Sequence, residues 1–429
     1  MRPLRRIVGL TLALLVVLAL ALPLAYRALG RRAAAQAAAD LAAEVGPLAL
    51  ARCGRPDVPA AANAAHWIQA GATAVALEPS ESVLLRELRN QPLREWNAEQ
   101  RANAAGIVDR NAFALVLLHK ATNLERSSFD LDYSLGYSMP IPNLVAVLNG
   151  GRLLLAELQT ELVRGDVDGA LLSQRAIRAL ARACQLESPT IFQFVGLALE
   201  RLAWQGLQDL TLASEVRGEA LAEFRRPLLD TSLDEQLQRS VACEATVSLT
   251  ASASDLARDL DVPDWIRPLI PYLKDRANAT DMGYLRRAMT LYPDHSAAEI
   301  LGGTDGAHAL LSRPAPSALG LPDYGWIPNA IHRFKAAESL RQVGTLALDL
   351  RQGALASGRY PVDLTEHPIA GANPYTGAPI AYHLEPDGSA WLEVPGASAL
   401  WRSNNPSPPS SERQTPSFVW RLPPIPPTS

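Results

Sequence analysis

One apolar run near the start of the chain, Ile7–Tyr26, constrains this sequence more than any other feature. The run holds twenty residues without a charge, and Thr11 is its one plainly polar side chain. As a helix rising 1.5 Å per residue it would measure about 30 Å, the thickness of the hydrocarbon core of a bilayer. Three arginines flank it on each side: Arg2, Arg5 and Arg6 before it, and Arg27, Arg31 and Arg32 after it. We therefore expect a transmembrane anchor over residues 7–26, within a basic N-terminal segment of residues 1–32.

The same pattern has a second interpretation as a cleaved secretory signal. A basic start, a leucine-rich centre and the small residues of Ala19-Leu20-Ala21 also describe a signal peptide. The apolar part of such a signal usually spans roughly 7–15 residues, which is shorter than this run. The length of the run therefore favours a retained anchor.

The orientation of the anchor is not fixed by the arginines alone, because three lie on each side. The N-terminal amine adds a positive charge to the first flank, and large domains are translocated largely regardless of charge. We expect a short cytoplasmic N-terminus and a body on the periplasmic side of the cytoplasmic (inner) membrane. Since residues 1–32 hold six arginines and no acid, the net charge of −4 leaves −10 for residues 33–429. Such an acidic body would repel phosphate backbones, so we expect no nucleic-acid partner.

Residues 33–328 are predicted to form a mainly α-helical body, in which residues 61–77, 80–90 and 97–121 are predicted helices. The pattern is clearest from residue 143 to residue 210. A helix over Leu144–Arg164 ends at Gly165, and Asp166 caps a second helix that runs to about Leu186. A third helix follows Pro189 with apolar residues at helical spacing. We expect an irregular array of helical hairpins, because no constant repeat length is present.

The character of the sequence changes towards the C-terminus. Residues 302–328 are rich in Gly and Pro and are predicted to be a loop, and Asn329–Ala356 is predicted to be one long helix. Ile380–Leu384 and Ala390–Val394 flank the turn residues Asp387-Gly388, which predicts a small β-hairpin within residues 329–402. Residues 403–429 hold eight prolines among serines and asparagines, which predicts a disordered tail.

The three cysteines are widely spaced. Because no C-x-x-C pair exists among Cys53, Cys184 and Cys243, we expect neither a disulfide framework nor a metal site. Buried small side chains are the expected role. In an oxidising compartment one bridge could form, and Cys184–Cys243 is the favoured pair.

No motif for a nucleophile elbow, a zinc protease, a dinucleotide fold or a P-loop occurs. The stretch Gly136-Tyr137-Ser138-Met139-Pro140 lacks the final glycine of a nucleophile elbow. The seven histidines never fall at ligand spacing on one helix. We predict no catalytic, cofactor-binding or metal-binding residue and no small-molecule ligand, and we expect no enzyme activity.

Two acids are the exception that keeps an enzyme among the alternatives. Asp130 and Asp132 lie in an irregular stretch, Ser127–Pro142, of a length that is often functional or disordered in compact domains. In an extended segment both carboxylates share one face, and two neighbouring carboxylates can divide acid and base roles. Hydrogen bonds to turns and helix starts are the simpler role for these acids.

The C-terminal segment resembles the major pseudopilin of type II secretion. The resemblance rests on a long helix, then Gly358-Arg359-Tyr360-Pro361, then Asn373-Pro374-Tyr375-Thr376-Gly377 and the Asp387-Gly388 turn. It covers about sixty residues, and Asn373 stands where the family pattern usually has Asp. It implies a helix followed by a small antiparallel sheet. At the N-terminus Gly9-Leu10-Thr11-Leu12 resembles a prepilin cleavage site, with the cut after Gly9. The likeness fails there, because Leu14 stands where that family places a glutamate five residues after the cut.

The whole layout is similar to an uncharacterised group of bacterial proteins with one N-terminal anchor and a helical body. The shared marks are Pro59 with Asn63-Ala64-Ala65, the aromatic–acidic stretch before Pro142, Gly165-Asp166 with Ala170, and Glu187 with Pro189. This resemblance implies a fold and no known activity.

Three functions follow from the sequence. The first is a membrane-anchored, extracytoplasmic scaffold that binds an envelope protein, since helical arrays offer surfaces for partner segments. The second is a component of a type II secretion or pilus-like assembly. The third is an envelope hydrolase that uses Asp130 and Asp132.

Overall fold

The fold is that of a computed structural model, which describes most of the chain. The described residues are 2–54, 57–88, 91, 93–213, 218–250, 270–301, 326–365, 367, 371–394 and 418–425. Among these, the side chains that remain outside the description are those of residues 2–16, 18–20, 22–23, 137, 218–219, 272–273, 301 and 418. Most of the predicted loop at 302–328 and residues 403–417 of the predicted tail also lie outside the described residues.

The described chain is mainly helical with a small antiparallel sheet, as predicted. Its α-helices are α1 (Arg2–Val45), α2 (Leu50–Cys53), α3 (Ala64–Ala74), α4 (Pro79–Leu88), α5 (Ala98–Arg110), α6 (Ala112–Lys120), α7 (Leu144–Arg164), α8 (Val167–Leu186), α9 (Thr190–Leu212), α10 (Gly218–Ala222), α11 (Leu233–Thr250), α13 (Ile270–Leu291), α14 (Ala297–Leu301) and α16 (Trp326–Ser357). Short 3₁₀ helices lie at η1 (Ala60–Ala62), η2 (Leu93–Glu95), η3 (Tyr133–Ser138) and η4 (Glu223–Arg225).

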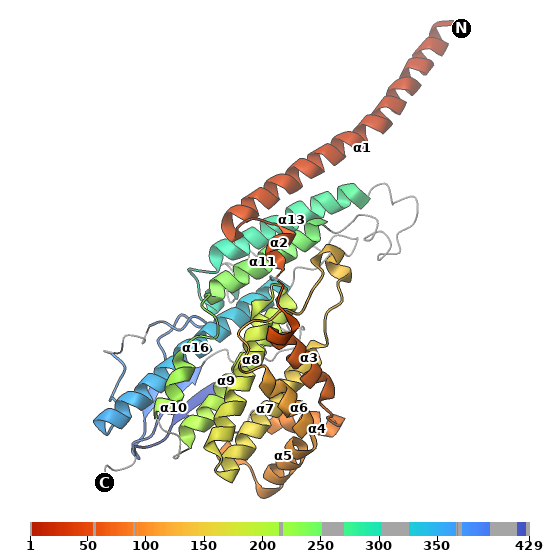
Figure 1. Cartoon of the computed structure of the whole chain (residues 1–429). Coiled ribbons are helices and arrows are strands. Elements are labelled where there is room, and N and C mark those ends of the chain that lie inside the picture. Colours follow the sequence, from red (N-terminus) through yellow and green to blue (C-terminus); the bar gives the residue numbers. More distant parts are fainter. Residues whose placement is uncertain are drawn as a thin grey trace.

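Helices α7, α8 and α9 form the centre of the body, and they begin and end where the sequence indicated. Gly165 adopts a left-handed conformation with φ of 77°, which ends α7. The Asp166 carboxylate accepts a 2.9 Å hydrogen bond from the Gly169 amide and thereby caps α8. Helix α9 follows Pro189 and is buried along nearly its whole length. The predicted helical hairpins are therefore present in this part of the chain (Figure 1).

The single helix predicted over residues 97–121 is wrong, since α5 and α6 are separate helices that meet at Asn111. The buried Asn111 side chain accepts a 2.7 Å hydrogen bond from the Ala76 amide and donates one of 3.1 Å to the Ala76 carbonyl. It also donates a 2.9 Å bond to the Ile107 carbonyl of α5. A side chain that bonds to backbone groups in this way competes with the continuous helix.

Helix α16 packs closely against α9. At Gly344 an added Cβ would lie 2.5 Å from the Trp204 ring, so the absence of a side chain permits this approach. The sheet packs against the same pair of helices. Trp420 of the sheet is fully buried and meets Trp204 edge-on, with ring centroids 5.9 Å apart. One continuous apolar cluster joins α9, α11, α13, α16 and the sheet.

Among the described residues, the sheet holds three antiparallel strands in the order β1-β2-β3. β1 (Tyr382–Leu384) and β2 (Ala390–Val394) form the predicted hairpin, with Gly388 at φ of 80° in its turn. β3 (Phe418–Leu422) comes from the tail and pairs with all five residues of β2. The prediction of a disordered tail is therefore wrong at residues 418–422. Trp420 and Leu422 are buried there, and their burial stabilises the strand. The prolines on either side of these residues led to the prediction of disorder.

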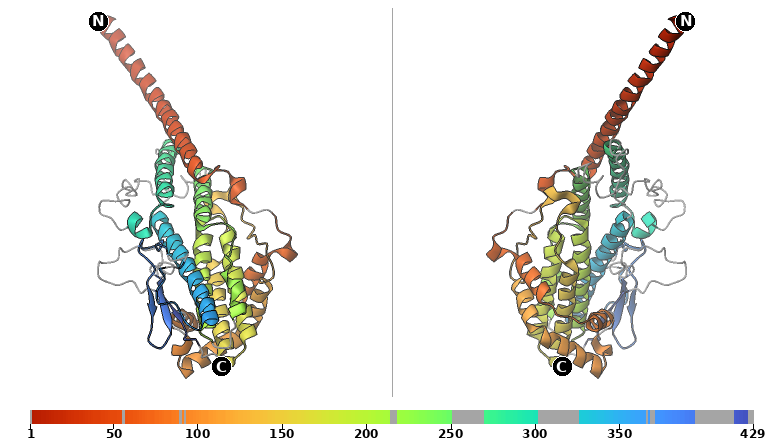
Figure 2. Two further views of the ribbon diagram at one scale, coloured as in Figure 1. Left: turned by 90° about the vertical axis from the view of Figure 1, so that its left-hand side faces the viewer. Right: turned by 90° about the vertical axis from the view of Figure 1, so that its right-hand side faces the viewer.

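Helix α1 connects a projecting N-terminal part to the body. Its first half extends away from the other helices, as the three views in Figures 1 and 2 show. Its last part packs along α13, where Leu41 and Val45 are buried in the main apolar cluster. The helix ends at Gly46, which has φ of 84°. Within the described part of the chain, no helix is both long enough and apolar enough to span a membrane.

Candidate functional site

The irregular stretch Ser127–Pro142 is fixed to the body by two buried side chains. Asn63 holds Ser128 at both backbone groups, since its Nδ2 donates to the Ser128 carbonyl at 2.8 Å and its Oδ1 accepts from the Ser128 amide at 3.0 Å. Glu187 at the end of α8 accepts a 2.9 Å hydrogen bond from the Phe129 amide and one of 3.4 Å from the Tyr133 hydroxyl. The residues that carry the second resemblance, Asn63 and Glu187, thus determine the path of this stretch.

Asp130 and Asp132 are both exposed and have different partners. Asp130 is the one described non-glycine residue with a positive φ, 54°, and its Oδ2 lies 3.2 Å from His66 Nε2. Asp132 accepts hydrogen bonds from the Ser134 amide at 3.0 Å and the Ser134 hydroxyl at 2.6 Å, so it caps η3. Division of acid and base roles requires two distinct environments, and solvent surrounds both carboxylates. Nothing in this geometry favours the hydrolase.

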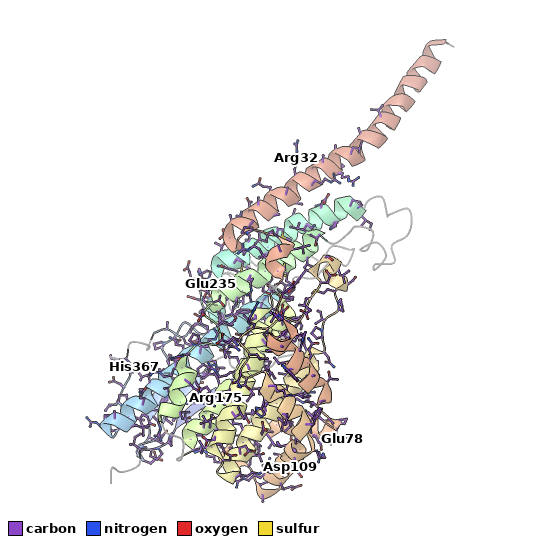
Figure 3. The ribbon with its side chains drawn as sticks, in the orientation of Figure 1. Arg32, Glu78, Asp109, Arg175, Glu235 and His367 are labelled. Atoms are coloured by element: carbon purple, nitrogen blue, oxygen red, sulfur yellow. The ribbon has the colours of Figure 1, made fainter. Side chains whose placement is uncertain are left out.

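A partly open cavity of about 340 Å³ lies where the end of α1 meets α2 and α11. Its walls come from the turn after α1, from α2 and from α11, and include Pro47, Arg52, Cys53, Glu235, Arg239 and Cys243. Ser232 and Glu235 start α11 with a reciprocal cap, in which the Ser232 amide donates to Glu235 at 2.8 Å and the Glu235 amide donates to Ser232 at 3.1 Å. Figure 3 labels Glu235 near this end of α11.

Cys53 and Cys243 are neighbours at the wall of this cavity. Both are buried, and with Tyr133 and Val247 they form a small apolar cluster apart from the main one. A side-chain hydrogen bond from Cys243 lowers the pKa of Cys53, and the same bond together with burial raises the pKa of Cys243. The side chain next to Cys243 is therefore that of Cys53, and the expectation that Cys184–Cys243 is the favoured pair is wrong. Cys184 is fully buried in a different apolar cluster, where burial raises its pKa.

Two buried acids lie between the central helices. Glu200 of α9 is paired with Arg341 of α16, with nitrogen–oxygen distances of 2.6 and 2.8 Å, and Gln185 also donates to it at 2.7 Å. Asp209 lies about two and a half turns after Glu200 on α9. It accepts a 2.8 Å hydrogen bond from Gln159. Burial raises the pKa of Asp209 to about 7, although hydrogen bonds from Gln159 and the Leu93 amide oppose the increase. Both acids join helices to one another and do not line the cavity.

Among the described residues, no group of three or more His, Cys, Asp or Glu side chains is arranged to hold a metal ion. The sequence did not predict that the thiols of Cys53 and Cys243 lie side by side at the cavity. Cys53 and Cys243 are 190 positions apart, and no local pattern links two such residues. In comparisons with known proteins, the chain matches no family model, no curated protein and no solved structure.

Proposed function

We propose that this chain is a single-pass membrane protein of a bacterial envelope, with a periplasmic helical body that binds a partner protein and carries no catalytic activity. The observation that supports it most is the continuity of α1 between the apolar run and the body. Residues 7–26 have the length and composition of an anchor, and the same helix continues to Val45, where it packs on α13. A rigid connection of this kind would hold the body at a fixed place next to the bilayer.

Two arginines in the middle of the run test the anchor. The Leu14→Arg, Leu15→Arg variant is expected to shift from the membrane fraction to the soluble or aggregated fraction, because each arginine opposes insertion by roughly 3 kcal/mol. The control carries Ala35→Arg and Ala39→Arg, which are exposed positions of α1 outside the run, and is expected to remain in the membrane. Fractionation, intact mass and protease access from the periplasm are the measurements.

The unmodified chain is expected in the membrane fraction at full-length mass, with a body that periplasmic protease cleaves. A mass that begins at Leu10 would indicate prepilin-like processing instead of an anchor. One that begins near Leu22 would indicate a secreted protein. Either trimmed mass would contradict the proposal, as would equal fractionation of the two double-arginine variants.

A pair of exposed apolar side chains supports the binding role. Phe113 and Val116 lie one turn apart on α6, where they share a face, and they are 71% and 55% exposed. Adjacent large apolar side chains in water mark surfaces that bind other proteins more often than isolated ones do. We therefore propose that this face of α6 forms part of the surface that binds the envelope protein.

Capture from a detergent extract tests this surface. The tagged chain is expected to retain an envelope protein, and Phe113→Ser with Val116→Ser is expected to reduce the amount bound at least tenfold. Val362→Ser is the matched control, because Val362 is 81% exposed on another part of the chain. If no envelope protein is recovered, or if all three chains recover the same amount, the scaffold function is wrong.

A component of a type II secretion or pilus-like assembly is the second candidate. The observation that favours it is the contact of α16 with β2 and β3, since a long helix followed by a small antiparallel sheet is what the pseudopilin resemblance implies. Helical assembly through residues 10–26, together with the processed mass that begins at Leu10, would support this candidate over the scaffold.

A further inference from the structure

We propose that Cys53 and Cys243 form a reversible disulfide that fastens α2 to α11 beside the cavity. The bridge would close at the point where the helix with the apolar run meets the body. It would also tie down the stretch Ser127–Pro142, because Tyr133 packs in the same cluster as the two cysteines.

Proximity is the first argument. The two side chains are in contact within a cluster of four buried residues, and they come from elements that pack directly on one another. Both cysteines are free thiols here, and each affects the pKa of the other through a side-chain hydrogen bond. The two side chains are therefore neighbours, which is the first requirement of a disulfide.

Access is the second argument. Both cysteines line the cavity of about 340 Å³, so a small reagent can reach them although the protein buries most of their surface. The third cysteine lacks this access: Cys184 is fully buried among apolar residues of α7, α8 and α9. The structure thus separates a pair of thiols at a cavity from a third thiol that lines no such opening.

The proposed bridge forms by thiol–disulfide exchange, and either thiol can begin the reaction, because both line the cavity and are buried to a similar extent. One order of steps begins at Cys53. The oxidant is a low-molecular-weight disulfide: Cys53 sulfur attacks one of its sulfurs, a mixed disulfide forms and one thiol leaves. Cys243 then attacks Cys53 sulfur and releases the second thiol. Two electrons and two protons pass to the oxidant, which ends as two thiols, and the reverse sequence reduces the bridge.

Mapping of the thiols tests the proposal on the full-length chain in detergent. The chain is equilibrated with oxidised glutathione, quenched with acid, unfolded, alkylated and digested. A linked peptide that contains Cys53 and Cys243, lighter by two hydrogen atoms than its parts, is expected in most of the material, with Cys184 alkylated. Reduction with excess dithiothreitol is expected to restore two alkylatable thiols.

Variants provide the controls. Cys184→Ser is expected to form the bridge as the unmodified chain does, and to unfold at a higher temperature when oxidised than when reduced. Cys53→Ser and Cys243→Ser are each expected to lose both the linked peptide and this temperature difference. The proposal would be overturned if Cys53 and Cys243 stay alkylatable after oxidation of the unmodified chain, or if the linked peptide contains Cys184.

This test does not depend on the membrane location or on a partner protein. Failure of the bridge would leave the proposed function in place, and a soluble chain could still form it. If both are correct, the oxidising periplasm would favour the bridged form.

Discussion

Replacement of Arg341 with methionine is expected to lower the free energy of unfolding by about 3–5 kcal/mol, because it leaves the Glu200 carboxylate buried without its charge partner. Burial opposes ionisation of Glu200, but the charge and hydrogen bonds of Arg341, with help from Gln185 and Arg178, outweigh it and hold the pKa of Glu200 below its ordinary value. The carboxylate therefore stays charged in the native protein. Without Arg341, no other side chain near Glu200 offsets the cost of burying the carboxylate to the same extent.

A double variant distinguishes charge pairing from simple loss of packing. Glu200→Gln keeps an oxygen that can accept the Gln185 hydrogen bond, and together with Arg341→Met it removes both charges. The double variant is expected to be more stable than the sum of the two single effects implies. Chemical denaturation in detergent measures the change in the free energy of unfolding for the two single variants and the double variant. If the two single changes add up to the change of the double variant, Glu200 and Arg341 are not coupled.

An exposed ion pair is the matched control. Arg175 of α8, labelled in Figure 3, lies 2.8 Å from Glu223, and both side chains are nearly half exposed. Arg175→Met is expected to change the free energy of unfolding by less than about 1 kcal/mol, because solvent screens such pairs. A loss as large as that of Arg341→Met would show that burial is not what distinguishes the two sites.

The stability of the protein is expected to fall as pH rises from about 4 to 7, through the buried carboxyl of Asp209. In the unfolded chain this group releases its proton near its ordinary pKa of 3.8, whereas burial raises the pKa in the folded chain to about 7. Between these values the unfolded state binds fewer protons than the native state, so each pH unit lowers the free energy of unfolding by about 1.4 kcal/mol. The contribution of this one group sums to about 4 kcal/mol and levels off above pH 7.

Asp209→Asn isolates this contribution. Asparagine is neutral at every pH and can still bond to Gln159, so the variant is expected to be as stable as the unmodified chain near pH 4 and more stable above pH 7. The difference between the two unfolding free energies, measured from pH 4 to 8, is the readout, because other titrating groups cancel in it. Asp109→Asn, at a side chain that is 64% exposed, is expected to show no such trend. A constant difference for Asp209→Asn would contradict the raised pKa.

Local signals in the sequence determined the centre of the fold. The ends of α7 and α8 follow from Gly165 and Asp166, because a left-handed glycine and a capping carboxylate act within a few residues of their own position. The β1–β2 hairpin follows from Asp387-Gly388 for the same reason. The apolar run of residues 7–26 also lies wholly within the sequence, and it still carries most of the proposed function.

Contacts between distant segments decided the rest. β3 forms because it pairs with β2 and because Trp420 packs edge-on against Trp204, which lies more than two hundred positions earlier in the chain. Asp209 has a raised pKa because packed helices exclude water from it, and its neighbours in the sequence give no sign of that. Cys53 and Cys243 likewise become partners only when α2 packs on α11. Burial and proximity depend on which surfaces of the folded chain meet. The residues whose substitution or titration we expect to change stability most could therefore be identified only from the tertiary structure.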